Sequence, residues 1–162
     1  MSTSKTTKAP GAAAENGGKK LSNFLCFAIY SANLAFGRAY KPLLDKLGLT
    51  YTQYVTLVAL SEEDDQTVGM LGEKLFLESN TLTPILKKLE VDGYLQRRRD
   101  PADERQVRLT LTAAGRALVD ADPGSALVEA TGLGDDFSTV QQSVAGLRDN
   151  LLRSMQPGSG KE

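Results

Sequence analysis

The sequence predicts a mainly α-helical protein with one small β-hairpin. Most of the chain repeats apolar residues at three- and four-residue spacing, which is the period of an amphipathic helix. Only residues 94–98 and 106–111 alternate apolar and polar side chains, as strands with one buried face do. With 162 residues, 41% of them hydrophobic and 24% charged, the chain is long enough to bury a core.

The first helix is expected over residues 21–41. Its apolar side chains recur at helical spacing, at Leu25, Ile29, Ala32 and Phe36. Ser22 or Asn23 is a suitable N-cap. Pro42 is expected to end the helix, because the residue before a proline avoids the helical region. A short helical turn closed by Gly48 should follow.

Two short helices come next, each with a clear start signal. Residues 50–53 form a capping-box pattern, which predicts a helix over residues 54–60. Thr67 is placed to cap the second helix, over residues 68–75.

A tight turn then leads into a helix that should end near Asp92, before Gly93. Its start is expected at one of three consecutive polar residues, Ser79, Asn80 or Thr81. The two strands follow, joined by the polar segment 99–105. A short helix, a tight turn, a second helix and a two-stranded hairpin together predict a winged helix-turn-helix.

The C-terminal part is expected to hold two helical regions. Thr112 caps a helix from Ala113, whose register dissolves within the glycine-containing segment 121–136. A final helix has one apolar face, formed by Phe137, Val140, Val144, Leu147, Leu151 and Met155. We expect this helix to join residues 21–41 in dimerisation.

The expected order divides the chain into five parts. The tails 1–20 and 157–162 are expected to be disordered, since their composition cannot bury enough surface to offset ordering. Between them we expect a sensor and dimerisation region (21–48), a winged helix-turn-helix lobe (49–112) and C-terminal dimerisation helices (113–156).

Composition argues against several kinds of site. The chain has no histidine and one cysteine, which disfavours a zinc site, a Ser-His-Asp triad and a Cys-His pair. We therefore expect no metal, no cofactor and no enzymatic activity. No run of 18 apolar residues exists to span a membrane, and the start of the chain lacks the apolar stretch of a secretion signal. A cytoplasmic location is expected.

Positive charge is local. The net charge is −1 overall, but residues 97–108 carry a net +2, whereas residues 113–162 carry a net −3. A short arginine-rich strip on an otherwise acidic protein favours a DNA-binding face.

Candidate DNA contacts lie on the second helix of the motif and on the hairpin. Four short polar side chains could let the helix approach base edges, Ser79, Asn80, Thr81 and Thr83. Lys87 and Lys88 suit the flanking phosphates. Arg105, braced by Asp103, could enter the minor groove. Arg97 opens a run of three arginines, although such a run is more often a solvated face, and the same layout also occurs in domains that bind proteins.

Cys26 is the candidate sensor. A helix N-terminus favours a thiolate, the form that attacks a peroxide. Tyr30 lies one turn further on the same face, within hydrogen-bonding reach of the sulfur. Tyr40 points within ~40° of that face but lies ~21 Å along the axis, so only a partner's Tyr40 could reach Cys26. The alternative is an inert thiol among apolar neighbours.

Two segments carry a family resemblance. LESNTLTPILKKLEVDGYLQRRRDPADERQVRLTLTAAG (77–115) closely resembles the recognition helix and wing of the MarR family. LCFAIYSANLAFGRAYKPLLDKLGLTYTQY (25–54) resembles the sensor helix of its single-cysteine, organic-hydroperoxide-responsive branch. The resemblance implies that Arg105 is the minor-groove arginine, with Asp103 as its partner. It also implies that Tyr30 and Tyr40 are sensor tyrosines, one from each subunit.

The resemblance implies a homodimeric repressor that binds an inverted repeat in double-stranded operator DNA. An organic hydroperoxide would oxidise Cys26 and release the DNA. Since the chain has no second cysteine, the sulfenic acid would end as a mixed disulfide with a low-molecular-weight thiol or as an over-oxidised form. Two alternatives stay open: a MarR-type regulator released by a small aromatic ligand, and a thiol peroxidase.

Overall fold

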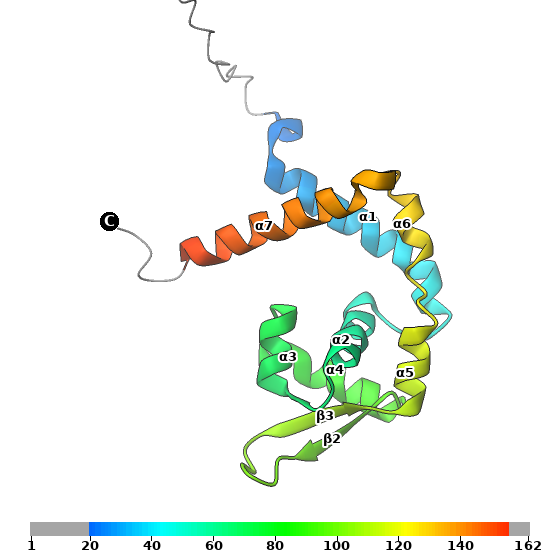
Figure 1. The fold of residues 1–162 in the computed structure, drawn as a ribbon, viewed down its shortest axis with the longest axis vertical. Coiled ribbons are helices and arrows are strands. Elements are labelled where there is room, and N and C mark those ends of the chain that lie inside the picture. The colour runs from blue at the N-terminus through cyan, green and yellow to red at the C-terminus, as the bar shows by residue number, and fades with distance from the viewer. Residues whose placement is uncertain (1–19, 156–162) are drawn as a thin grey trace, which may run out of the picture. The chain divides into compact units, whose positions relative to one another are not determined.

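The computed structural model describes residues 20–155, so the expected tails lie outside the described residues apart from Lys20. Its α-helices are α1 (Leu25–Asp45), α2 (Tyr51–Glu62), α3 (Val68–Leu75), α4 (Ser79–Val91), α5 (Ala113–Asp120), α6 (Ala126–Ala130) and α7 (Phe137–Met155). Its strands are β1 (Gln66–Thr67), β2 (Leu95–Arg99) and β3 (Val107–Leu111), and 3-10 turns occupy Leu21–Asn23 and Gly134–Asp136. The predicted class, mainly helical with a small hairpin, is confirmed (Figure 1). Two compact units divide within α1, between Phe36 and Gly37.

The first helix differs from its prediction at both ends. A 3-10 turn takes up Leu21–Asn23, so α1 starts only at Leu25 and neither Ser22 nor Asn23 caps it. At the other end, α1 runs through Pro42 to Asp45 instead of stopping before the proline. A proline removes one backbone donor without forbidding the next turn when packing compensates. Here Leu44, two residues beyond Pro42, is 1% exposed in the core and stabilises that turn.

Three predicted start signals are confirmed. Thr50 and Gln53 form a reciprocal capping box on α2, although the helix is longer than the predicted 54–60. Thr67 accepts a hydrogen bond from the Met70 backbone N–H at the start of α3, and Thr112 accepts one from the Gly115 N–H at the start of α5. Each cap satisfies one of the N–H groups that a helix start leaves without a partner.

The predicted start of α4 is confirmed, because the helix begins at Ser79, the first of the three polar residues expected there. Its N-cap is Glu78, which makes no side-chain cap hydrogen bond. In the turn before α4, Phe76 takes a left-handed conformation (φ 57°) and its N–H bonds back to the Glu73 and Gly72 carbonyls. The Leu77 N–H also donates to Gly72.

The sheet has a strand that the sequence pattern did not predict. β1 holds only two residues and pairs antiparallel with β3, so the strand order is β1-β3-β2. β2 and β3 form the predicted hairpin, with Arg97 opposite Leu109. Figure 1 shows the loop of this hairpin extending beyond the helices α2, α3 and α4.

The core lies between these helices and the sheet. Its fully buried side chains are mostly leucines, including Leu57, Leu60, Leu71, Leu82, Leu86, Leu89, Leu95 and Leu109. Burying apolar side chains from α2, α3, α4 and both long strands fixes the helix pair and the hairpin as one unit.

The long terminal helices expose apolar side chains instead. On α7 these are Val140, Val144, Leu151 and Met155, and on α1 they are Leu25, Tyr30, Leu34 and Phe36. Within residues 20–155, no helix is both long and apolar enough to cross a membrane.

Candidate nucleic-acid interface and cysteine site

Helix α4 presents a polar face to solvent. Ser79, Asn80, Thr81 and Thr83 are all exposed, whereas Leu82, Leu86 and Leu89 are at most 1% exposed and hold the opposite face in the core. The Thr83 hydroxyl donates to the Ser79 carbonyl at 2.7 Å, which leaves its oxygen free to accept a further bond. The structure therefore brings the four predicted side chains to one accessible surface.

The two predicted lysines of α4 differ in their surroundings. Lys88 pairs with Asp92 one turn further, at 2.8 Å from Oδ2. Lys87 is exposed and has no ion pair with any residue between 20 and 155. Lys87 is thus the lysine whose charge is available to a phosphate.

Arg97 faces α4 rather than open solvent. Its Nε lies 2.7 Å from Glu90 Oε2 and its backbone N–H donates to Glu90 Oε1 at 3.1 Å. The Arg97 guanidinium holds the pKa of the Glu90 carboxyl below its usual value. The pair joins α4 to β2, so Arg97 holds these two elements together more than it adds charge to the exposed face of α4.

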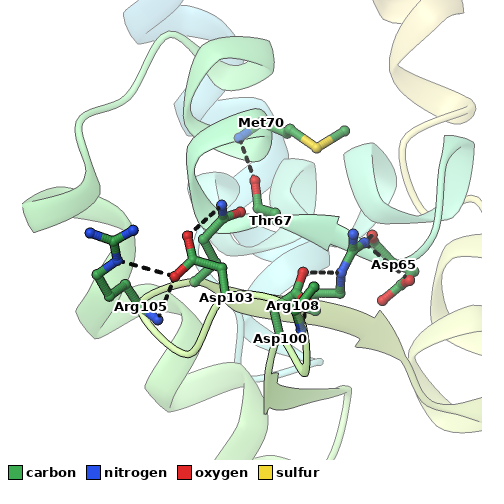
Figure 2. Close-up of polar contacts among 9 residues, drawn as sticks. Asp65, Thr67, Met70, Asp100, Asp103, Arg105 and Arg108 are labelled. Atoms are coloured by element: carbon green, nitrogen blue, oxygen red, sulfur yellow. Dashed lines mark hydrogen bonds and ion pairs between the residues drawn. The ribbon is translucent and has the colours of Figure 1, made fainter.

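The loop of the hairpin is organised by Asp103. Its Oδ1 accepts from both the Arg105 backbone N–H and Nε, each at 3.1 Å, and its Oδ2 accepts from Gln106 Nε2 at 3.2 Å (Figure 2). The Arg105 guanidinium, followed by these other donors, lowers the pKa of Asp103. The Arg105 side chain is 93% exposed and points away from the loop. The predicted brace between the two residues is present.

A second set of ion pairs fixes the base of the loop, and sequence reasoning missed it. Asp100 is 7% exposed and accepts from the Ala102 N–H at 2.8 Å and from Arg108 Nε at 2.7 Å. Arg108 also donates to the Asp65 carbonyl at 2.7 Å and to its carboxylate at 3.1 Å (Figure 2). The Ala102 N–H and Arg108 lower the pKa of Asp100. The sequence feature that could have revealed the Asp100–Arg108 pair is an acidic and a basic residue at facing ends of the two predicted strands.

The lone thiol lies at the start of α1. Cys26 is the second residue of that helix and is exposed. The Phe27 and Ala28 N–H groups bond to the Phe24 carbonyl, whereas Cys26 lies within the first turn, where N–H groups lack intrahelical acceptors. This position supports the partial positive charge that we expected beside the sulfur.

Tyr30 does not bond to the thiol. Its ring packs 6.4 Å from that of Phe27, measured between centroids, and it is 58% exposed. No hydrogen bond joins its hydroxyl to Cys26 in the part of the chain that the structure describes.

Tyr40 belongs to an aromatic cluster. Its ring centroid lies 4.9 Å from that of Tyr51 and 6.1 Å from that of Tyr54. Tyr54 is 6% exposed, whereas Tyr51, the first residue of α2, is 43% exposed. Burial, and then the neighbouring Tyr51, Tyr54 and Asp122, raise the pKa of Tyr40, so its hydroxyl stays protonated and able to donate. Sequence reasoning missed Tyr51, because the pairing joins two helices.

Among residues 20–155, no group of three or more His, Cys, Asp or Glu side chains is placed to hold a metal ion. The arrangement thus offers two kinds of chemistry: exposed polar side chains on α4 together with the exposed Arg105 of the hairpin loop, and an exposed thiol.

Comparisons with known proteins find transcriptional regulators. The family described as "Transcriptional regulator SarA/Rot" matches residues 38–121. The "Organic hydroperoxide resistance transcriptional regulator" of Bacillus subtilis is 40% identical over 135 residues, 82% of this chain and 92% of that protein. The regulator TtmR of Methylorubrum extorquens is 52% identical over 100 residues, which are 62% of this chain but only 51% of TtmR.

The solved structures confirm the winged helix-turn-helix. AbfR of Staphylococcus epidermidis is 34% identical, with a TM-score of 0.72 over 83% of this chain and 93% of AbfR. Other AbfR structures are described as the reduced protein and the overoxidised protein, each bound to DNA.

Proposed function

This chain belongs to the SarA/Rot family of transcriptional regulators, and we propose that it is a dimeric repressor whose Cys26 senses organic hydroperoxides. The exposed thiol in the first turn of α1 carries this proposal, because it lies on a chain that also presents an exposed polar helix face. The relative named for organic hydroperoxide resistance and the reduced and overoxidised AbfR structures support it.

DNA would be bound by α4 and the hairpin. The exposed face of α4 enters the major groove, where Ser79, Asn80, Thr81 and Thr83 contact base edges. Lys87 contacts a phosphate. Lys88 contacts another when its ion pair with Asp92 is replaced by one with the DNA. Arg105, held by Asp103, enters the minor groove, and Arg97 keeps β2 in place against α4.

A dimer would place two such units on an inverted repeat. The exposed apolar side chains of α1 and α7 are the surface that a second copy covers, since large exposed apolar faces mark association sites. A two-fold axis then relates two α4 helices, which read half-sites about one helical turn apart.

The sensing step is a two-electron oxidation. The Cys26 thiolate attacks the terminal peroxide oxygen, an S–O bond forms and the O–O bond breaks. The alkoxide leaves as the alcohol after protonation, and the sulfur becomes a sulfenic acid. A low-molecular-weight thiol then displaces water to give a mixed disulfide, or further peroxide over-oxidises the sulfur.

Tyrosine hydroxyls would hold the thiolate before this step. Tyr30 belongs to the same helix and would bond to the sulfur only once the dimer forms, and the partner's Tyr40 would reach across the dimer axis. Tyr51, stacked beside Tyr40 and 43% exposed, joins Tyr40 in this role. Oxidation removes these bonds, and the two DNA-reading units then lose register with the half-sites.

Because the chain has no second cysteine, only an external thiol could resolve the sulfenic acid. The regulators among its relatives favour a switch over a turnover cycle, so we propose a regulator rather than an enzyme, located in the cytoplasm with its operator.

The test is operator release by an alkyl hydroperoxide. Fluorescence anisotropy with a labelled operator follows the reduced protein and its Cys26→Ser variant during titration with cumene hydroperoxide. We expect the parent to release DNA and the variant, which removes only the reactive sulfur, to stay bound. Release by the variant would refute the proposal. Release by an aromatic acid without oxidation would favour a ligand-controlled regulator, and sustained peroxide consumption with added thiol would favour a peroxidase.

A further inference from the structure

Gly124 lies against the hydroxyl of Tyr40. A Cβ atom at residue 124 would lie 2.7 Å from Tyr40 Oη, and 3.1 Å and 3.3 Å from Cε1 and Cζ of the same ring. Gly124 is buried, in the segment between α5 and α6. No side chain larger than hydrogen fits there while Tyr40 keeps its place.

The Tyr40 ring cannot move aside freely. It packs against Tyr51 and Tyr54, at 4.9 Å and 6.1 Å between centroids, and Tyr54 is 6% exposed in the core. A methyl group at residue 124 would therefore push Tyr40 toward Tyr51 or push the α5–α6 segment outward.

Asp122 adds an electrostatic element to the same segment. It has a left-handed backbone (φ 41°) and its carbonyl accepts from the Ser125 N–H at 3.2 Å. Its charge contributes to the raised pKa values of Tyr40 and Tyr54, in both of which burial is the larger cause. A protonated hydroxyl can donate to an anion, whereas a phenolate cannot.

We infer that Gly124 is a positioning residue for peroxide sensing. This inference rests on the proposed function. Because Gly124 has no side chain, the α5–α6 segment sets where the Tyr40 hydroxyl lies. The position of that hydroxyl then determines how well it bonds the partner's Cys26 thiolate. Gly124 itself touches neither thiol nor peroxide.

The test compares Cys26 oxidation in the parent, three variants and one control. The variants are Gly124→Ala, Tyr40→Phe and the Gly124→Ala/Tyr40→Phe double variant. Gly69→Ala in α3 is the matched control, because its nearest neighbour within 4 Å would be Thr67 Oγ1 at 3.8 Å. Stopped-flow oxidation by cumene hydroperoxide gives the rate, and operator binding by the reduced protein checks that each variant is folded.

We expect Gly124→Ala to bind operator when reduced but to oxidise on the order of tenfold more slowly, since a small misplacement of a positioned group costs rate heavily. In the Tyr40→Phe background the same change should alter the rate by less than about twofold, because the hydroxyl that it displaces is already absent. Gly69→Ala should oxidise at the parent rate.

Two results would overturn the inference: oxidation of Gly124→Ala at the parent rate, or an equal slowing in the Tyr40→Phe background. If Gly124→Ala does not fold, recovery of folding in the double variant supports the contact with the hydroxyl, and failure of both variants contradicts it. Failure of the proposed function itself looks different, because the parent would then keep its operator after Cys26 is oxidised.

Discussion

Asp103 anchors Arg105 but leaves part of its guanidinium group free. The Asp103 carboxylate accepts hydrogen bonds from the Arg105 Nε and backbone N–H, whereas both terminal guanidinium nitrogens have no partner among residues 20–155. A guanidinium that is already oriented loses less conformational entropy when it enters a groove. We therefore expect the acidic neighbour to help DNA binding, although its charge alone repels DNA.

This arrangement predicts different operator affinities for two variants that change the net charge by the same amount. Asp103→Asn and Glu104→Gln each remove one negative charge, but Glu104 is exposed and makes no ion pair within the described chain. We expect Asp103→Asn to weaken operator binding by about three- to tenfold, the size of one lost charge-assisted hydrogen bond. Glu104→Gln should bind equally or more tightly. Anisotropy titrations at one salt concentration measure both, and tighter binding by Asp103→Asn would contradict the brace.

The base of the hairpin loop gives a pH dependence. The pKa of Asp100 is lowered by the Ala102 N–H and Arg108, so the folded state favours its ionised form. The stabilisation is therefore present above the unfolded pKa, near 4, and is lost as the pH falls through the lower folded value. We expect Asp100→Asn to lose stability relative to the parent at pH 7 and to converge with it in acid. Urea unfolding at several pH values measures this. Asp135→Asn, an exposed carboxylate, is the control, and a constant gap at all pH values would refute the assignment.

At the scale of elements, short local signals were predicted well and distant pairings were not. The caps at Thr50, Thr67 and Thr112 depend on residues three positions away, so the sequence displays them. β1 exists because Gln66 pairs with Leu109, more than 40 positions away, and no two-residue pattern announces it.

The same division holds at the site. The exposed face of α4 follows from helical period, and the Asp103–Arg105 brace spans two residues, so both could be predicted. The Arg108–Asp65 pair and the Tyr40–Tyr51 contact join separate elements, and neither spacing nor composition reveals them. The prediction that Pro42 ends the first helix was wrong for a related reason. The packing of Leu44 in the core outweighs the local tendency of proline to end a helix.

The cap of α3 offers a test of element stability. Thr67 is both the N-cap of α3 and a residue of β1. We expect Thr67→Ala to lower the free energy of unfolding by about 1 kcal/mol, the usual cost of losing an N-cap. Thermal or urea unfolding measures this. Thr139→Ala, at an exposed position within α7, is the control and should change stability little; equal effects would contradict the cap.

At the scale of the whole molecule, the proposed dimer would account for the exposed apolar surfaces. Leu151 is 55% exposed and Val144 is 47% exposed along one face of α7. Such side chains cost free energy in water unless a partner covers them.

We expect Leu151→Glu to weaken the dimer and, with it, operator binding. Gln142→Glu adds the same charge on α7 about 160° around the helix from Val144, at ~100° per residue, and should leave both unchanged. Sedimentation equilibrium and anisotropy on the same samples measure this. A Leu151→Glu protein that remains dimeric would contradict the role assigned to this face.

The central claim is that oxidation of one sulfur releases the operator. Mass spectrometry of Cys26 after substoichiometric cumene hydroperoxide, with anisotropy on the same sample, tests it most directly. The account predicts that the fraction of protein released rises with the fraction of Cys26 oxidised. Release from DNA with Cys26 still reduced, or full oxidation with the operator still bound, would contradict it.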